Sequence, residues 1–347
     1  MEYQSEMLKP DVFGLNSADT MRKPLDGFSF LSSVRSNTKS LWQMSKKSPS
    51  FDSLPSGKND LSFPVLEAML RQKAGLEHLD QDSQIILGLY DHKSGYTNAG
   101  LLFSSENSFP GVEVIRYGNS KKEILVRRLF DHQLILEIYF DVSDLFGLFY
   151  SMERIEDFER TRFFQIPEAA FQEALANALL TQDWSIKAIP VLIEMFEDRI
   201  EITSPGGLPE GMSGKMVNEL YERKVYFTLR NLLTAHVFSL LGLSREYGTG
   251  SARIQEAYRK EPVKPSFQIT ENSIKTTLPV IGQFDSMKRD QKRIYSFLKK
   301  NGSSSRLDIQ LHCGFSRSKT TALLNDMAAA NMISRSGKSR SVQYSLL

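Results

Sequence analysis

The stretch E-A-L-A-N-A-L-L-T-Q-D-W-S, from Glu173 to Ser185, holds the pattern that decides the fold. Pro167 stands just before this region and suits the first turn of a helix. The apolar residues here recur at the three- and four-residue spacing of a single helix face: Phe171, Ala174, Leu175, Ala178 and Leu179. We therefore predict a helix over residues 167–180 that buries one apolar stripe.

Two strands and two glycine-rich loops follow this helix. The predicted strands are I-P-V-L-I-E-M-F (189–196) and R-I-E-I-T (199–203), joined by a tight turn at Glu197–Asp198. S-P-G-G (204–207) is too rich in Gly and Pro to continue a strand, and a second helical region is expected at about 213–241. G-T-G (248–250) then opens another helix. Helices layered on a mixed sheet predict an α/β (α+β) sandwich.

Glu173 and Asn177 lie four residues apart, so a helix places both side chains on one face, about one turn from each other. An amide oxygen at such a position can hold Mg²⁺, and a carboxylate can orient a water molecule. The same spacing is also common on the solvated side of ordinary helices. The two glycine loops favour the ligand interpretation, because glycine lets the backbone approach a nucleotide and a helix N-terminus favours phosphate.

Neither loop matches the Walker P-loop or the G-x-G-x-x-G dinucleotide fingerprint, because Arg253 occupies the place of the last glycine. The helix, strand and glycine-loop segments described above resemble, in this order, bacterial predicted transcriptional regulators of the Schlafen/AlbA type. The segment L-R-N-L-L (229–233), which lies between the two glycine loops, is part of the same resemblance. Those proteins carry a divergent ATP-binding domain similar to the gyrase, heat-shock chaperone, histidine kinase and mismatch-repair (GHKL) superfamily. The resemblance covers about residues 163–281.

A looser resemblance to the end of the N-terminal Schlafen/AlbA domain precedes this region. It consists of V-R-S-N-T-K-S (34–40), S-F-D-S-L-P (50–55) and T-N-A-G-L-L-F (97–103). Because only about 35 residues precede the first of these segments, we expect that domain to be truncated.

The resemblance implies roles for individual residues. Glu173 would be the general base and Asn177 the Mg²⁺ ligand of an ATP site. The residues implied around the nucleotide are Asn177, Asp183, Ser204, Gly206, Gly207, Arg230, Asn231, Gly248 and Gly250. Ser204 replaces the aspartate that reads adenine in the wider superfamily, and Thr181-Gln182-Asp183 replaces the family's usual His-Arg-Asp. ATP binding is thus the firmer expectation, and weak GHKL-type hydrolysis is left open.

The C-terminal segment carries an opposite charge to the remainder of the chain. From Lys288 to Leu347 it holds 12 Lys and Arg against 3 Asp and Glu, although the whole chain has a net charge of only +2. Three short helices and a final hairpin predict a winged helix-turn-helix with double-stranded DNA as its partner. The predicted DNA contacts are Ser316, Arg317, Ser318, Lys319, Thr321, Arg335, Lys338 and Arg340. A dimerisation or protein-docking module is the alternative for this unit.

Four segments are therefore expected along the 347 residues. They are a weakly ordered Schlafen/AlbA-type remnant (1–60), an α+β connecting region (61–158), a divergent GHKL-like ATP-binding domain (159–283) and a winged helix-turn-helix (286–347). No apolar run approaches the length of a membrane span, and the first twenty residues lack a signal-peptide core, so a cytoplasmic location is expected. One cysteine, Cys313, excludes an internal disulfide and a zinc site of several thiolates.

These observations favour a DNA-binding, ATP-responsive transcriptional regulator that uses Mg·ATP as its input and either acts alone or as a homodimer. Two alternatives remain open at this point. One is a DNA-associated ATPase that drives a conformational cycle, and the other is a nucleotide-free dimerisation or scaffold protein.

Overall fold

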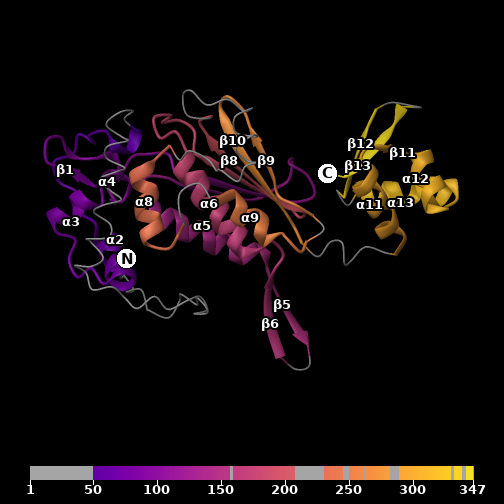
Figure 1. The fold of residues 1–347 in the computed structure, drawn as a ribbon, viewed down its shortest axis with the longest axis horizontal. Coiled ribbons are helices and arrows are strands. Elements are labelled where there is room, and N and C mark those ends of the chain that lie inside the picture. Colours follow the sequence, from indigo (N-terminus) through magenta and orange to yellow (C-terminus); the bar gives the residue numbers. More distant parts are fainter. Residues whose placement is uncertain are drawn as a thin grey trace, which may run out of the picture.

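The computed structural model describes residues 50–156, 159–207, 230–244, 250–261, 263–281, 289–329, 332–337 and 341–346 (Figure 1). Most of the predicted 1–60 remnant lies outside these ranges, as does most of the helical region expected at 213–241. Gly248, Lys338 and Arg340 also lie outside the described residues.

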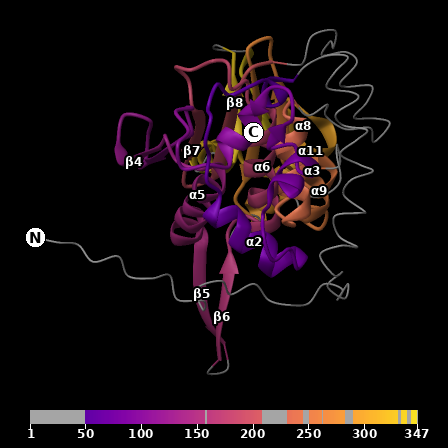
Figure 2. The ribbon, with the colours of Figure 1, turned by 90° about the vertical axis from the view of Figure 1, so that its left-hand side faces the viewer.

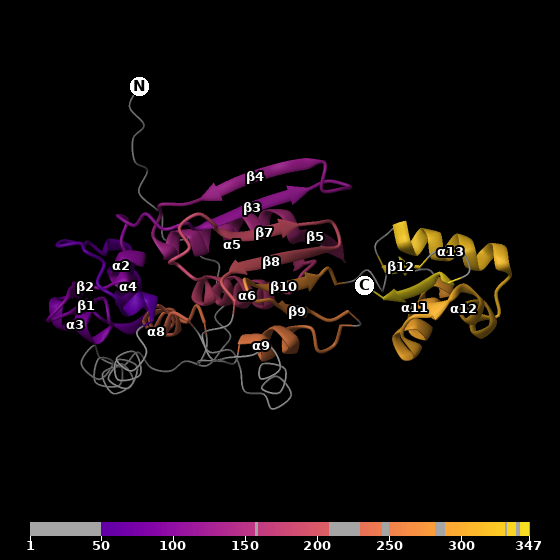
Figure 3. The ribbon, with the colours of Figure 1, turned by 90° about the horizontal axis from the view of Figure 1, so that it is seen from above.

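A six-stranded mixed sheet forms the centre of the molecule, with the strand order β4-β3-β7-β8-β10-β9 (Figure 3). Its strands are β3 (Val112–Tyr117), β4 (Ile124–Phe130), β7 (Val191–Met195), β8 (Arg199–Pro205), β9 (Ser266–Ile269) and β10 (Ser273–Pro279). β3 runs parallel to β7 and the other neighbours are antiparallel. The hairpin predicted at 189–203 is confirmed as β7 and β8, with its turn closed by a hydrogen bond from Phe196 N to Arg199 O.

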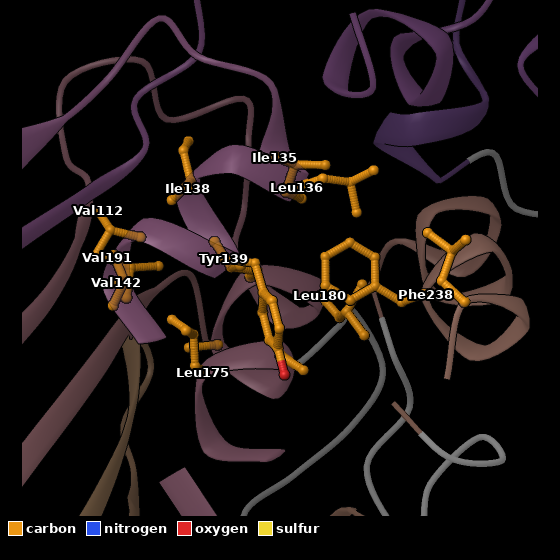
Figure 4. Packing of buried hydrophobic residues seen from close by; sticks show 14 of the residues in the cluster. Val112, Ile135, Leu136, Ile138, Tyr139, Val142, Leu175, Leu180, Val191 and Phe238 are labelled. Carbon is orange, nitrogen blue, oxygen red and sulfur yellow. The ribbon is translucent and has the colours of Figure 1, made fainter. Parts of the chain in front are cut away.

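Three helices lie along one face of this sheet: α5 (Ile135–Tyr150), α6 (Glu168–Thr181) and α9 (Gly250–Ala257) (Figures 1 and 2). The whole apolar stripe predicted for α6 is buried. Figure 4 shows Val112 and Val191, partners on adjacent strands, beside Val142 of α5. The mixed sheet with helices on it confirms the α+β sandwich expected from the sequence.

Among the described residues, the opposite face of the sheet carries ion pairs and no second layer of helices. Arg127 Nε donates to Glu113 at 2.6 Å, and Lys121 Nζ donates to Glu194 at 2.6 Å. Glu201 accepts from both Arg199 and Lys275, at 2.7 and 2.8 Å. Alternation of apolar and paired polar residues along each strand allows an antiparallel sheet to face water on one side.

The strands β3 and β4 belong to the region expected to be a separate connecting segment over 61–158. The sheet therefore runs across the boundary expected at residues 158–159. Residues on either side of that boundary form β5 (Ser151–Glu156) and β6 (Glu159–Phe164), an antiparallel hairpin that projects from the body (Figure 2).

Short elements pack at one end of the sheet: η2 (Phe51–Ser53), α2 (Pro64–Ala74), α3 (Gln81–Ile86), β1 (Tyr90–Asp91), β2 (Gly95–Tyr96), α4 (Asn98–Leu102) and α8 (Leu232–Leu240). The sequence pattern predicts Ser62 as the cap of a helix in V-L-E-A-M-L-R-Q-K-A (65–74) and a strand in G-L-L-F-S (100–104), and both predictions fail. The expected cap Ser62 is not used, because α2 begins at Pro64 after Phe63. The strand expected at 100–104 is instead mostly α4, which Thr97 initiates by accepting a hydrogen bond from Gly100 N. The apolar stretch after Leu134, whose pattern does not distinguish a helix from a strand, forms the helix α5.

Asp52 ties this end of the molecule to α8. Its buried carboxylate accepts hydrogen bonds from Thr234 N at 2.9 Å and Thr234 Oγ1 at 3.1 Å, across 182 residues of sequence. The N-cap residue Asn231 makes no side-chain cap bond, so Asp52 supplies the acceptor that the first turn of α8 needs. Burial is the largest influence on this carboxyl group and raises the pKa of Asp52.

The C-terminal module has its own core and lies apart from the sheet (Figures 1 and 3). It contains α11 (Arg289–Asn301), β11 (Ser304–Ser305), α12 (Arg306–Cys313), α13 (Arg317–Ala329), β12 (Ile333–Ser336) and β13 (Gln343–Leu346). The three helices and the hairpin predicted from the sequence are present, and β11 joins the hairpin as a third strand. Gly302 ends α11 with φ 70°, and a capping box of Ser305 and Asp308 starts α12. Within the described ranges, no helix is long and apolar enough to cross a membrane.

Candidate functional site

The side chains of Glu173 and Asn177 meet the first residue of α9. A Cβ atom placed on Gly250 would lie 2.5 Å from Glu173 Oε1 and 2.6 Å from Asn177 Oδ1, and closer still to Asn177 Nδ2. Only a glycine backbone can come this near to both side chains. The structure thus brings together the helix pair and one glycine of the second loop. Gly248, the other predicted glycine of this loop, lies outside the described residues.

Arg253 completes this cluster. Its Nη1 donates to Glu173 Oε2 at 3.0 Å, and the Glu173 side chain is only 2% exposed. A carboxylate this deeply buried needs a charged partner, because an unpaired charge in the interior is costly. Sequence reasoning noted Arg253 only as a departure from a dinucleotide fingerprint. Its position one helical turn after Gly250, on the same face of α9, was the available signal for a place in the site.

Tyr139 of α5 is buried near the same ion pair. Burial, and to a lesser extent the charge of Glu173, raises the pKa of Tyr139, so the phenol stays neutral. It therefore adds no charge to the pair of Glu173 and Arg253.

Asn177 differs from Glu173 in having a free side chain. It is partly exposed, and its amide makes no hydrogen bond to another described residue. Only its backbone carbonyl is engaged, by Thr181 Oγ1 at 2.8 Å. The amide oxygen of Asn177 is thus not committed to a hydrogen bond with another described residue, and an amide oxygen is a suitable Mg²⁺ ligand.

The first glycine loop packs against its own chain. Gly206 has φ 92°, and a Cβ atom there would lie 2.6 Å from Asp183 Cβ. A Cβ atom on Gly207 would overlap the carbonyl oxygen of Glu271 in the turn between β9 and β10. Ser204 is also committed to the chain, because its hydroxyl donates to Ala178 O at 2.8 Å. Contacts within the chain therefore account for Gly206, Gly207 and Ser204 without a ligand.

Arg230 and Asn231, which the resemblance placed around the nucleotide, instead brace this loop. Arg230 Nη2 donates to Gly207 O at 2.9 Å, and its Nη1 lies 3.3 Å from Asp183 Oδ2. Asn231 Nδ2 donates to Leu180 O and Gln182 O, at 3.0 and 2.9 Å. The pair fixes the end of α6 to the first glycine loop.

The donor set suits a metal ion that arrives with a nucleotide. Among the described residues, no group of three or more His, Cys, Asp or Glu side chains could hold a metal by itself. Mg²⁺ commonly takes one or two protein ligands and completes its shell with phosphate oxygens and water. One free amide oxygen beside a carboxylate fits that requirement, so the residues present are compatible with Mg·ATP.

Some of the predicted DNA contacts are exposed side chains, and others are bonded to neighbouring residues of the module. Arg317 and Ser318 are exposed at the start of α13, and Arg335 is exposed on β12. Ser316 accepts from Lys319 N at 3.2 Å and thereby starts α13, while Thr321 is partly buried and bonds Arg317 O at 2.9 Å.

Lys319 is held within the module by two contacts. Its Nζ pairs with Asp290 at 2.6 Å and lies 4.8 Å from the centre of the Phe315 ring. Lys338 and Arg340 lie outside the described residues.

Residues 189–278, from β7 to β10, match the family model described as "Putative ATP-dependent DNA helicase recG C-terminal". An ATPase-like domain is present here. The matched segment includes both glycine loops of the ATPase-like domain and α9, whereas α6 with Glu173 and Asn177 precedes it.

The fold is also similar to a solved structure, the DIP2311 protein from Corynebacterium diphtheriae. The TM-score is 0.58 at 17% sequence identity, over 89% of this chain and 67% of that chain. At this identity the likeness concerns the fold alone. No curated protein matches the sequence.

Proposed function

We propose that the protein is a DNA-binding transcriptional regulator whose ATPase-like domain binds Mg·ATP as its input. The observation that carries the nucleotide site is the contact of Gly250 with both Glu173 and Asn177, where one amide oxygen remains free. The family match over the glycine loops supports the same site. The Schlafen/AlbA-type resemblance of 34–40, 50–55 and 97–103 supports a regulatory role.

Several groups of the site would bind Mg·ATP together. Asn177 would hold Mg²⁺ through its amide oxygen, and the N-terminal amides of α9 would bind phosphate. Bound Mg²⁺ would neutralise phosphate charge. Ser251 is buried in the first turn of α9, and its hydroxyl finds no hydrogen-bond partner among the described residues, which leaves one further polar group beside Gly250.

Glu173 has the chemistry of a general base, but its ion pair with Arg253 holds it in this conformation. Its Oε2 atom already accepts a hydrogen bond from Arg253 Nη1, so this oxygen is not placed to accept a proton from water. Nucleotide binding is therefore the function that we propose, with hydrolysis as a slow secondary activity.

The C-terminal module would bind double-stranded DNA. Its support is the excess of basic residues after Lys288 and the exposure of Arg317, Ser318 and Arg335 on α13 and β12. Exposed Arg and Lys side chains provide affinity through phosphates and make binding depend steeply on salt.

Fluorescence anisotropy with a labelled duplex tests both parts of the proposal. DNA affinity of the parent protein should fall steeply as salt rises, and Mg·ATP should change that affinity. The change should disappear in Asn177→Ala and remain in Gln172→Ala, a control on the same helix whose side chain donates a hydrogen bond to Glu168 at 3.4 Å. DNA binding that ignores salt would contradict the DNA assignment, and an equal Mg·ATP response in both variants would contradict the site.

A further inference from the structure

The first turn of α9 closes directly over the polar pair of α6. Gly250 and Arg253 lie three residues apart on one face of α9, and each contacts Glu173. Gly250 supplies a backbone contact and Arg253 supplies a charged one. The two helices are therefore joined at the point where the nucleotide site is proposed.

The Gly250 contact leaves no room for a ligand between the helices. A single added methyl group at Gly250 would already collide with the Asn177 amide and the Glu173 carboxylate. A phosphate group or a hydrated Mg²⁺ ion is larger than a methyl group. Mg·ATP can therefore contact both the Asn177 amide oxygen and the N-terminal amides of α9 only if the start of α9 moves away from α6.

The Arg253 contact opposes that movement. Glu173 is 2% exposed, so withdrawal of Arg253 would break an ion pair of a buried carboxylate, which is costly. The Arg253 side chain is 35% exposed, so its guanidinium can turn into water when α9 moves. The ion pair thus stabilises the closed arrangement more than the open one.

We propose that Arg253 is a latch that holds the start of α9 against α6, and that Mg·ATP binding requires the Arg253–Glu173 ion pair to open. This inference rests on the proposed nucleotide site and adds its regulation. The apparent affinity for the nucleotide is then reduced by the fraction of molecules in which the latch is open.

Calorimetric titration of Mg·ATP into Arg253→Gln tests the latch. If about one molecule in ten is open in the parent, the variant should bind about tenfold more tightly. Arg259→Gln is the matched control, because Arg259 follows the same helix and pairs with Glu256 on the surface, with both side chains at least 66% exposed. This control should bind Mg·ATP as the parent does.

Glu173→Gln provides a second route to the same result, because it removes the other charge and leaves Arg253 free to turn outward. It also keeps the test valid if Arg253→Gln does not fold. Each single variant should bind more tightly than the parent, and the double variant should gain no more than the larger single gain, because both act through one ion pair.

The outcomes separate the latch from the proposed function. If the parent binds Mg·ATP and the variants Arg253→Gln and Glu173→Gln bind it equally or more weakly, the latch is overturned and the nucleotide site stands. Additive gains in the double variant also overturn it. Binding by the variants but not by the parent supports both proposals, whereas absence of binding in every protein overturns the nucleotide site and the latch with it.

Discussion

The ATPase-like domain and the C-terminal module hold their charged residues in opposite ways. Beside the first, Glu173 is buried and already paired with Arg253, and Asp183 is paired with Arg230. In the second, Arg317 and Arg335 are exposed. A ligand of the first region must rearrange existing contacts, whereas a polyanion can approach the second as it stands. Charged residues that the sequence marks as candidate contacts can therefore lie either in ion pairs within the protein or on an exposed surface.

The largest expected effect concerns the glycine loop of the ATPase-like domain. Gly207→Ala should lower the free energy of unfolding by about 3 kcal/mol, because its Cβ atom would overlap the backbone carbonyl of Glu271 in the turn between β9 and β10. Urea denaturation measures this change. Gly147→Ala is the control, since Gly147 lies in α5 and its nearest neighbour would be the flexible end of Arg162 at 3.3 Å. The control should be neutral or stabilising by up to about 1 kcal/mol. Equal losses in the two variants would contradict this explanation of Gly207.

The next effect concerns the tie between Asp52 and α8. Asp52→Ala should cost about 2 kcal/mol, because it removes the acceptor for Thr234 N in the first turn of α8. Asp52→Asn keeps an acceptor oxygen and should lose less in the same urea titration.

The difference in stability between the parent and Asp52→Asn should depend on pH. Burial raises the pKa of Asp52, so the unfolded state ionises first as pH rises. The parent should therefore lose stability relative to Asp52→Asn as the pH rises above about 4, the ordinary pKa of an aspartate. A difference between the two proteins that stays constant as the pH rises would show that the carboxyl is not perturbed by burial.

The smallest expected effect concerns the salt dependence of DNA binding by the C-terminal module. Arg317→Ala should reduce the slope of log affinity for DNA against log salt by about 1, because one phosphate contact is lost. Lys319→Ala should change the slope less, since Asp290 already neutralises Lys319 at 2.6 Å. Anisotropy titrations at several salt concentrations measure both slopes. An equal reduction in both variants would mean that the Lys319 pair opens when DNA binds.

The sequence predicted those elements whose pattern is local. The stripe from Phe171 to Leu179 gave α6, and alternating apolar residues with a two-residue turn gave β7 and β8. The strand expected at 100–104 was wrong because the cap at Thr97 decided the local structure, and a short apolar run does not distinguish strand from helix.

The long-range parts of the site were not predictable in this way. Spacing placed Glu173 and Asn177 on one face, but it did not show that Gly250 and Arg253 would close over them from 73 or more residues away. The addition of β3 and β4 to the sheet was also invisible, because parallel pairing joins segments that are distant in the chain. Such contacts depend on tertiary packing, which periodicity alone does not specify.

Hydrogen exchange of the parent protein with and without saturating Mg·ATP tests the central claim most directly, because it reports where the nucleotide acts. The account predicts changed exchange in the amides of α6 (Glu168–Thr181) and α9 (Gly250–Ala257), with α11 unchanged as an internal control. Unchanged exchange in both α6 and α9, or a change confined to the C-terminal module, would contradict a nucleotide site between these two helices.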